Sequence, residues 1–146
     1  MASATASRRR PVLPSTPDWG GWELTFMVPG QPQPWQRAGT HGGRRFTPRE
    51  TADAEALVAS YAALALRGRL PLSGPVELSL WFYRANRVRC DLDNLEKLVK
   101  DALNKVAWLD DSQVTDVAKV KRVDPANPRT VVRVRPAPEA AMESWR

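Results

Sequence analysis

One segment of the chain joins an apolar helical repeat to acidic pairs at both of its ends. Between residues 91 and 106 apolar side chains recur at intervals of three and four residues, the spacing of a helix with one buried face. Asp91 and Asp93 stand at the start of this repeat, and Asp110 and Asp111 follow its end. The segment therefore predicts an amphipathic helix that packs on a core and carries carboxylates at both ends. Its apolar positions are Leu95, Leu98, Val99, Ala102, Leu103 and Val106.

Four further segments have the pattern of β-strands. Apolar and polar side chains alternate in residues 21–29 and 74–85, so one face of each segment is apolar. Residues 113–123 and 130–136 follow the acidic segment, and the prolines and asparagine between them are typical of a turn. With two helices, the order strand–helix–strand–helix–strand–strand predicts an α+β fold. We expect a single small domain in which two helices pack on a partly antiparallel sheet.

The first of the two expected helices follows a loop rich in glycine and proline. Thr47 and Pro48 predict its start, with the threonine hydroxyl as the cap and the proline at the first helical position. Gly68 predicts its end. The spacing of its apolar residues predicts a buried stripe. That stripe is Ala54, Leu57, Val58, Tyr61, Leu64 and Ala65.

Length and composition favour one folded domain between two tails. A chain of 146 residues suits a single domain. Residues 1–21 are rich in Ala, Ser, Thr, Pro and Arg without periodicity, which predicts a flexible basic arm. Residues 22–135 form the expected domain, and residues 136–146 the expected C-terminal tail. No apolar run approaches the roughly 20 residues of a membrane span, so we expect a soluble, cytoplasmic protein with no membrane partner.

The charge balance favours a polyanionic partner. Lys and Arg number 22 against 16 Asp and Glu, a formal net charge of +6. Such an excess favours nucleic acid ahead of a membrane surface. The single cysteine, Cys90, excludes an intrachain disulfide.

The acidic pairs allow a structural and a catalytic interpretation. Asp91 can cap the helix, and Asp93 can favour its positive N-terminal end. Two carboxylates about 4 Å apart repel by roughly 4 kcal/mol at an effective dielectric of about 20, and a divalent cation removes that penalty. Lys97, four residues after Asp93, places a cation on the same helix face. Clustered carboxylates with a nearby cation are what metal-dependent phosphodiester hydrolysis requires.

The two acidic pairs can meet in one of two ways. A helix over residues 91–106 is about 22 Å long at about 1.5 Å per residue. The five further residues to Asp111 cover at most about 18 Å at about 3.6 Å each. Within one chain, Asp111 therefore approaches the helix start only if the helix ends a turn early and the chain doubles back. Otherwise the pairs meet across a dimer, and the sequence leaves both arrangements open.

Two motifs in this region are specific. The helix starts with D-x-D-N-hydrophobic-x-K, and W-x-D-D-x-Q-V follows it. Together they resemble the RusA family of Holliday junction resolvases. Upstream, "FMVPGQPQPWQRAGTHGGRRFTP" is similar to the phage-borne branch of that family in its V-P-G-x-P turn, arginine-bearing loop and T-P helix start. The resemblance covers roughly residues 22–135, and the matching positions around the acidic segment are Asp91, Asp93, Asn94, Lys97, Asp101, Ala102, Leu103, Asp110, Asp111, Gln113 and Val114.

This resemblance implies a homodimeric, Mg²⁺-dependent crossover junction endodeoxyribonuclease, with Mn²⁺ as a substitute metal. Such an enzyme resolves four-way DNA junctions by paired symmetric nicks in recombination and repair. The family's metal-binding aspartates fall on Asp91, Asp93 and Asp111, and its catalytic lysine falls on Lys97. Cys90 is a departure, because arginines often reach the first aspartate in that family. The resemblance also implies a bacterial host and a phage or prophage gene.

Basic residues surround the acidic segment and are expected to contact DNA phosphates, although each has the alternative of a solvated surface charge. Contacts of this kind make affinity fall by about 0.9 log units per log unit of salt for each phosphate. Two other functions stay open: a nuclease for other branched DNA, and a catalytically inactive module that binds junctions. The expected DNA-binding residues are Arg37, Arg44, Arg45, Arg84, Arg87, Arg89, Lys119 and Lys121.

Overall fold

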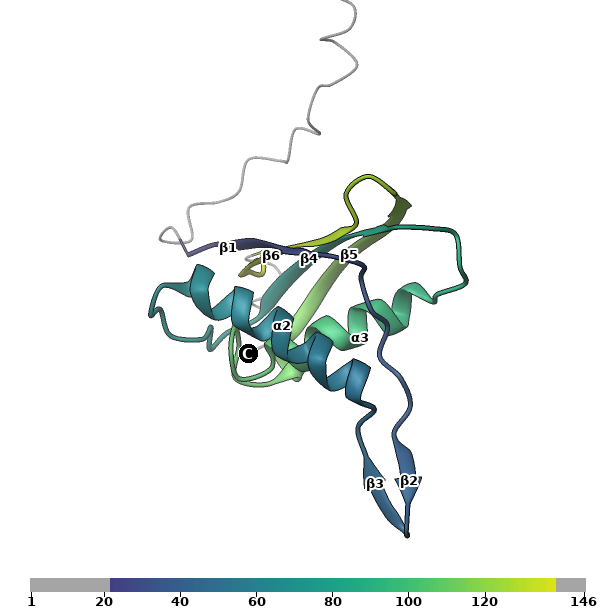
Figure 1. Ribbon diagram of the computed structural model, residues 1–146. Coiled ribbons are helices and arrows are strands. Elements are labelled where there is room, and N and C mark those ends of the chain that lie inside the picture. Colours follow the sequence, from purple (N-terminus) through teal and green to yellow (C-terminus); the bar gives the residue numbers. More distant parts are fainter. Residues whose placement is uncertain (1–21, 139–146) are drawn as a thin grey trace, which may run out of the picture.

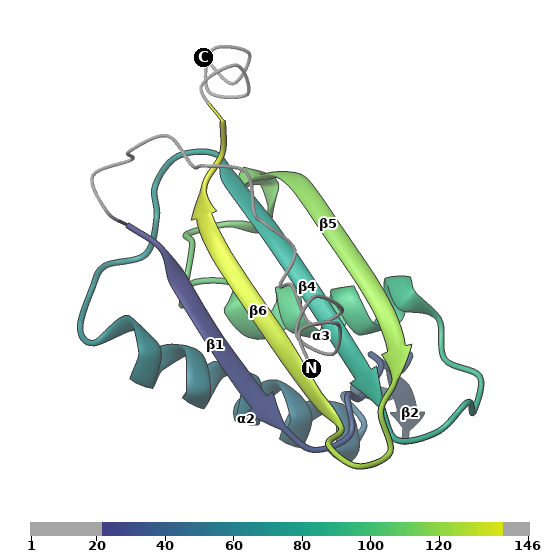
Figure 2. The ribbon, with the colours of Figure 1, turned by 90° about the horizontal axis from the view of Figure 1, so that it is seen from above.

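Two helices lie on one face of a four-stranded sheet, and a small hairpin projects beside them (Figures 1 and 2). The computed structural model describes residues 22–138, so the predicted arm over residues 1–21 and most of the predicted tail lie outside the described residues. The elements in chain order are β1 (Leu24–Pro29), β2 (Gly39–His41), β3 (Arg44–Phe46), α2 (Arg49–Leu66), β4 (Val76–Arg84), α3 (Leu92–Leu103), the 3₁₀ turn η1 (Asp111–Gln113), β5 (Val114–Val123) and β6 (Arg129–Pro136).

The sheet is mixed and has the order β1-β6-β4-β5. β4 pairs in parallel with β5, because α3 carries the chain back between them, and the other two strand pairs are antiparallel. The α+β prediction, with two helices packed on a partly antiparallel sheet, is confirmed.

The core lies between the sheet and the helices. The alternating side chains predicted to face inward on β1 and β4 are buried, as are those predicted on α3 up to Leu103. Trp108, which follows α3, is fully buried beside them. The packing of these residues places the N-terminal end of α3, with its carboxylates, against the edge strand β5. The buried strand residues are Leu24, Phe26, Val28, Val76, Leu78, Leu80 and Phe82.

The predicted face of α2 is partly wrong. Leu57 and Leu64 are 46% and 76% exposed, whereas Thr51 and Ala62 are buried. Alanines lie on several sides of this helix, so the spacing of its apolar residues does not single out the buried side. The helix also starts after Pro48 and has no side-chain cap hydrogen bond, so the predicted cap at Thr47 is not formed.

The segment before α2, predicted as a loop, contains the β2–β3 hairpin. Gly42 and Gly43 connect its strands with φ angles of 59° and 79°. Positive φ at both central residues is the requirement of the hairpin turn that suits twisted strands, and glycine meets it at little cost. Arg44 and Arg45 lie on β3, so the hairpin carries two of the expected DNA-binding residues away from the sheet (Figure 1).

Candidate active site

The end of α3 determines where Asp111 lies relative to the helix. The helix ends at Leu103, three residues before the predicted end at Val106. Lys105 then adopts a left-handed conformation with φ 68°, and its N–H donates to the carbonyl of Trp108 at 2.7 Å. This tight turn reverses the chain and brings Asp111 back beside α3. Within one chain Asp111 therefore lines the same pocket as Asp93, whereas Asp91 does not, and a meeting of the acidic pairs across a dimer stays a prediction.

A pocket of about 320 Å³ lies where α3 faces the reversed segment. Its lining combines four carboxylates with two lysines, and we call it the acidic pocket. It brings together the predicted Asp93, Lys97 and Asp111, but Asp91 is not part of its lining. The lining residues are Asp93, Glu96, Lys97, Lys100, Asp101 and Asp111.

Asp111 is held in place from the core side. The buried Trp108 donates its indole N–H to Asp111 Oδ1 at 2.8 Å. Gln113, 5% exposed, accepts from two backbone N–H groups of the turn and donates to the carbonyls of Leu72 and Gly74. The contacts of Gln113 fix the backbone around Asp111. Trp108 binds one oxygen of the Asp111 carboxylate, and the second oxygen is left for the pocket.

The neighbouring Asp110 has a structural role instead. Its carboxylate accepts from the backbone N–H and the hydroxyl of Ser112 and caps η1. Both hydrogen bonds lower the pKa of the Asp110 carboxyl, and the one from the Ser112 hydroxyl has the larger effect. Asp110 therefore stabilises the turn from which Asp111 projects.

Lys119 of β5 pairs with the carboxylates at the start of α3. Its ammonium lies 2.5 Å from Asp93 Oδ1 and 3.4 Å from Glu96 Oε1. The hydrogen bond from Lys119, and next its charge, lowers the pKa of the Asp93 carboxyl, and the same hydrogen bond raises the pKa of Lys119. Asp93 is therefore ionised at neutral pH. Lys119, expected to contact DNA, is a counter-ion of the acidic pocket in this structure.

Lys97 has two close partners, one on α3 and one in the loop after β1. Its ammonium lies 3.2 Å from Asp101 on the next turn of α3 and 4.8 Å from the ring centre of Trp35. Glu55 of α2 is a second acidic neighbour. Burial raises the pKa of the Glu55 carboxyl, the charge of Asp101 raises it further, and Lys97 opposes both.

The donor chemistry of the acidic pocket fits a hard divalent cation. Carboxylate oxygens are the ligands that Mg²⁺ prefers, and Asp93 and Asp111 share the pocket with Glu96. The Lys119 ammonium already supplies positive charge at Asp93. Within residues 22–138, however, no three acidic, histidine or cysteine side chains stand close enough to enclose an ion. The predicted set of three aspartates is therefore not assembled in this arrangement.

Asp91 faces a second surface, which we call the basic cleft. This pocket of about 580 Å³ adjoins the start of α3 and contains Asp91 among five cationic residues. Asp91 and Asp93 thus place one carboxylate on each of two neighbouring surfaces, one basic and one acidic. Cys90 also lines the basic cleft, where it is buried and its backbone carbonyl accepts a hydrogen bond from Lys121. The cationic residues of the cleft are Arg84, Arg87, Arg89, Lys121 and Arg122.

The prediction that Arg84 contacts DNA does not fit its position. Arg84 is 7% exposed, and it donates to the carbonyl of Pro32 at 2.7 Å. Pro32 belongs to residues 30–36, which follow β1 and which we call the strap. Because β4 ends under the strap, the Arg84 guanidinium is used to fasten it. Arg37, Arg87 and Arg89 are exposed, as expected of phosphate contacts.

Sequence reasoning missed two contributors to the site, Glu96 and Trp35, and it gave Lys119 a contact with DNA in place of its pairing with carboxylates. Glu96 faces the acidic pocket one turn after Asp93, and its i+3 spacing was the available signal. Trp35 and Lys119 come from segments distant in the chain, and only the fold brings them to α3. Among the described residues, no helix has the length and apolar character needed to cross a membrane.

Comparison with known proteins supports the resemblance over most of the described chain. The model of the family described as Endodeoxyribonuclease RusA matches residues 29–135. Proteins named crossover junction endodeoxyribonuclease RusA, from Escherichia coli strain K12 and from Enterobacteria phage 82, are each 47% identical to the chain over 51 residues. That match covers 34% of this chain and 42% of each relative. The family match spans the strap, the hairpin, both helices and β4 to β6, and the chain belongs to the RusA endodeoxyribonuclease family.

Proposed function

We propose that the chain is a Mg²⁺-dependent endodeoxyribonuclease that resolves four-way DNA junctions by paired nicks. The observation that carries this proposal is the placement of Asp91 and Asp93 at the first turn of α3. One carboxylate faces a basic cleft suited to a phosphate backbone, and the other faces an acidic pocket suited to a cation. Membership of the RusA family and the names of its relatives support the same activity.

Asp93 and Asp111 of the acidic pocket are the proposed Mg²⁺ ligands, and Mn²⁺ is expected to substitute. Asp91, which lines the basic cleft in this structure, would join them if its side chain turned toward the acidic pocket. When bound, the ion supplies positive charge for the scissile phosphate and polarises a water molecule. Trp108 orients the carboxylate of Asp111 through its indole N–H. Lys119, which pairs with Asp93 in this structure, would be available to a phosphate if an ion replaced it at that carboxylate.

Lys97 is the proposed cation for the transition state. Its ammonium lies in the acidic pocket and is 46% exposed, so a phosphate can reach it. As a point charge with three donors, it can stabilise the negative charge that develops on the phosphate or on the leaving oxygen.

The basic cleft is the proposed path of the DNA backbone, and this makes a salt-dependence prediction. Arg87→Ala and Arg89→Ala should each lower the slope of log Kd against log salt by about one, because each removes one phosphate contact. Fluorescence anisotropy with a labelled junction measures the slope. Arg49→Ala, which removes an exposed arginine of α2, is the matched control and should leave the slope unchanged. Equal slopes for all three variants and the wild type would remove the cleft from the DNA path.

A homodimer completes the proposal. Two symmetric nicks require two equivalent sites, and a two-fold dimer matches the symmetry of a four-way junction. We also propose that the protein acts in the bacterial cytoplasm and is encoded by a phage or prophage, in line with the relative from phage 82.

Cleavage of a synthetic four-way junction tests the function directly. With one strand labelled at a time, the protein should nick two opposing strands at symmetric positions in Mg²⁺ or Mn²⁺ and none in EDTA. Three-way and linear competitor DNA should inhibit less than an unlabelled four-way junction does. Equal inhibition by a three-way junction would redirect the proposal to other branched DNA, and binding without nicking in any metal would make the chain a non-catalytic junction-binding module.

A further inference from the structure

The strap, residues 30–36, is fastened along its whole length. In its first half the buried Arg84 donates to the carbonyl of Pro32 at 2.7 Å. At its far end the backbone N–H of Trp35 donates to the carbonyl of Asn94, in the first turn of α3, at 2.9 Å. The other fastenings are Gly30 N to Pro128 O, Ala85 N to Gln31 Oε1, and Gln36 N to Thr51 Oγ1.

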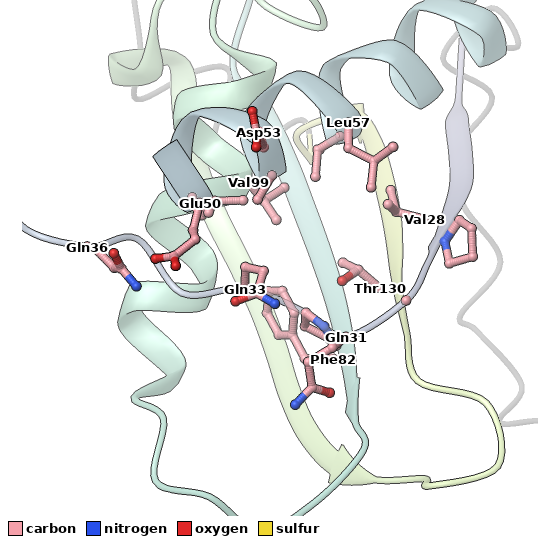
Figure 3. A pocket seen from close by; sticks show the side chains of 16 residues that line it. Val28, Gln31, Gln33, Gln36, Glu50, Asp53, Leu57, Phe82, Val99 and Thr130 are labelled. Carbon is pink, nitrogen blue, oxygen red and sulfur yellow. The ribbon is translucent and has the colours of Figure 1, made fainter. Parts of the chain in front are cut away.

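Hydrogen bonds, more than packing against α2, determine where the strap lies. A pocket of about 640 Å³ separates the strap from α2 and the sheet (Figure 3). Gln31 and Gln33 line it on the strap side, and Glu50 and Asp53 line it on α2. Because this side of the strap faces a pocket, the contact of the strap with α3 depends on its hydrogen bonds and on the packing of Trp35 against the core.

The fastened end of the strap places an aromatic ring over Lys97. The Trp35 ring centre lies 4.8 Å from the Lys97 ammonium, within the range of a cation–π contact. The other close partner of this ammonium is the Asp101 carboxylate at 3.2 Å. Lys97 is 46% exposed, and its flexible four-carbon stem would otherwise let the ammonium move freely in solvent.

Trp35 and Asp101 hold the ammonium in chemically different ways. The Asp101 carboxylate accepts a hydrogen bond from it, and its negative charge competes with a phosphate. The face of Trp35 attracts the cation through the ring quadrupole, carries no net charge and leaves the N–H donors available. An aromatic partner therefore restricts the position of the ammonium without neutralising it.

We propose that Trp35 is a positioning residue for Lys97, holding its ammonium where it meets the scissile phosphate. This inference rests on the catalytic role of Lys97 in the proposed function. The strap then has a role in the reaction. Its five hydrogen bonds, including the one from the buried Arg84, hold Trp35 in place, and Trp35 restrains one catalytic side chain.

Substitutions at Trp35 distinguish the effect of its aromatic ring from the effect of its volume. Trp35→Leu keeps apolar volume and removes the aromatic face, so kcat for junction nicking should fall about five- to thirtyfold with KM nearly unchanged. Trp35→Phe restores a ring and should recover kcat to within about threefold of the wild type. Thermal unfolding and junction binding are measured for both variants, and a Leu variant that folds, binds and retains wild-type kcat overturns the inference.

A double-mutant cycle with Lys97→Met decides whether Trp35 acts through Lys97. If it does, Trp35→Leu slows the wild-type background but has no further effect on Lys97→Met. If the Leu change slows both backgrounds by the same factor, Trp35 acts elsewhere, and the inference fails while the proposed function stands. If Lys97→Met itself nicks at the wild-type rate, the proposed role of Lys97 fails, and the inference fails with it.

Discussion

Asp93→Asn is expected to abolish junction nicking while the protein still folds and still binds the junction. Asp93 is exposed at the first turn of α3, and its amide replacement fits the same space. Loss of the negative charge removes a proposed ligand for Mg²⁺, and an effect of this kind costs at least about 10²-fold in rate. Binding should be retained or become tighter, because the change removes a negative charge near the phosphate path.

Nicking is measured on a labelled junction, and metal affinity by isothermal titration with Mg²⁺ or by the electron paramagnetic resonance of Mn²⁺. Asp116→Asn is the matched control: it makes the same chemical change on β5, outside the acidic pocket, and should cleave and bind metal normally. Asp91→Asn tests whether the residue facing the basic cleft is also a ligand. Wild-type metal affinity in both the Asp91 and Asp93 variants would separate the first turn of α3 from the metal site.

Lys119 links metal binding to DNA binding in this scheme. In the free protein its ammonium occupies Asp93 and approaches Glu96, so the pocket is partly neutralised from within. In the proposed function, a divalent cation held by Asp93 would compete with this ammonium for the same carboxylate. Pairing with carboxylates is the observed state of Lys119, and its contact with DNA stays a prediction.

The two helices show how far this fold could be predicted from the sequence. In α3 the apolar residues occupy a single stripe, and five of its six predicted members are buried. In α2 alanines and leucines lie on several sides, so Leu64 was assigned to the core although it is 76% exposed. Periodicity predicts a buried face only when the other faces are polar.

The site follows the same division between local and distant information. The D-x-D motif and Lys97 were identified from their neighbours in the chain; the motif does lie at the start of α3, and Lys97 follows in its second turn. The return of Asp111 depends on the turn at Lys105, which has a left-handed backbone. Glycine or asparagine usually occupies such a position, so a lysine there does not indicate the turn. Arg84 was expected to contact DNA as one of the basic residues around the acidic segment. Its burial depends on the strap, which comes from a segment 52 residues away in the chain.

Trp108 gives the second prediction with a large effect, because one side chain serves both core and site. It is fully buried, and its indole N–H donates to Asp111 at 2.8 Å. Trp108→Ala should lower the free energy of unfolding by about 3–5 kcal/mol, the cost of removing a large buried aromatic side chain. Trp108→Phe keeps most of the apolar volume and loses the hydrogen bond, so it should cost only about 1–2 kcal/mol.

The Phe variant isolates the effect on the site, since it folds but no longer orients the Asp111 carboxylate. Loss of a partner that orients a metal ligand typically costs 10- to 100-fold in metal affinity or activity. We therefore expect nicking by Trp108→Phe to require more Mg²⁺ than the wild type and to recover as Mg²⁺ is raised, whereas Asp93→Asn does not recover. Trp81→Phe on β4, the same substitution outside the acidic pocket, is the control and should leave the Mg²⁺ requirement unchanged. A folded Trp108→Phe protein with a wild-type Mg²⁺ requirement would mean that Asp111 is oriented by its backbone alone, or is not a ligand.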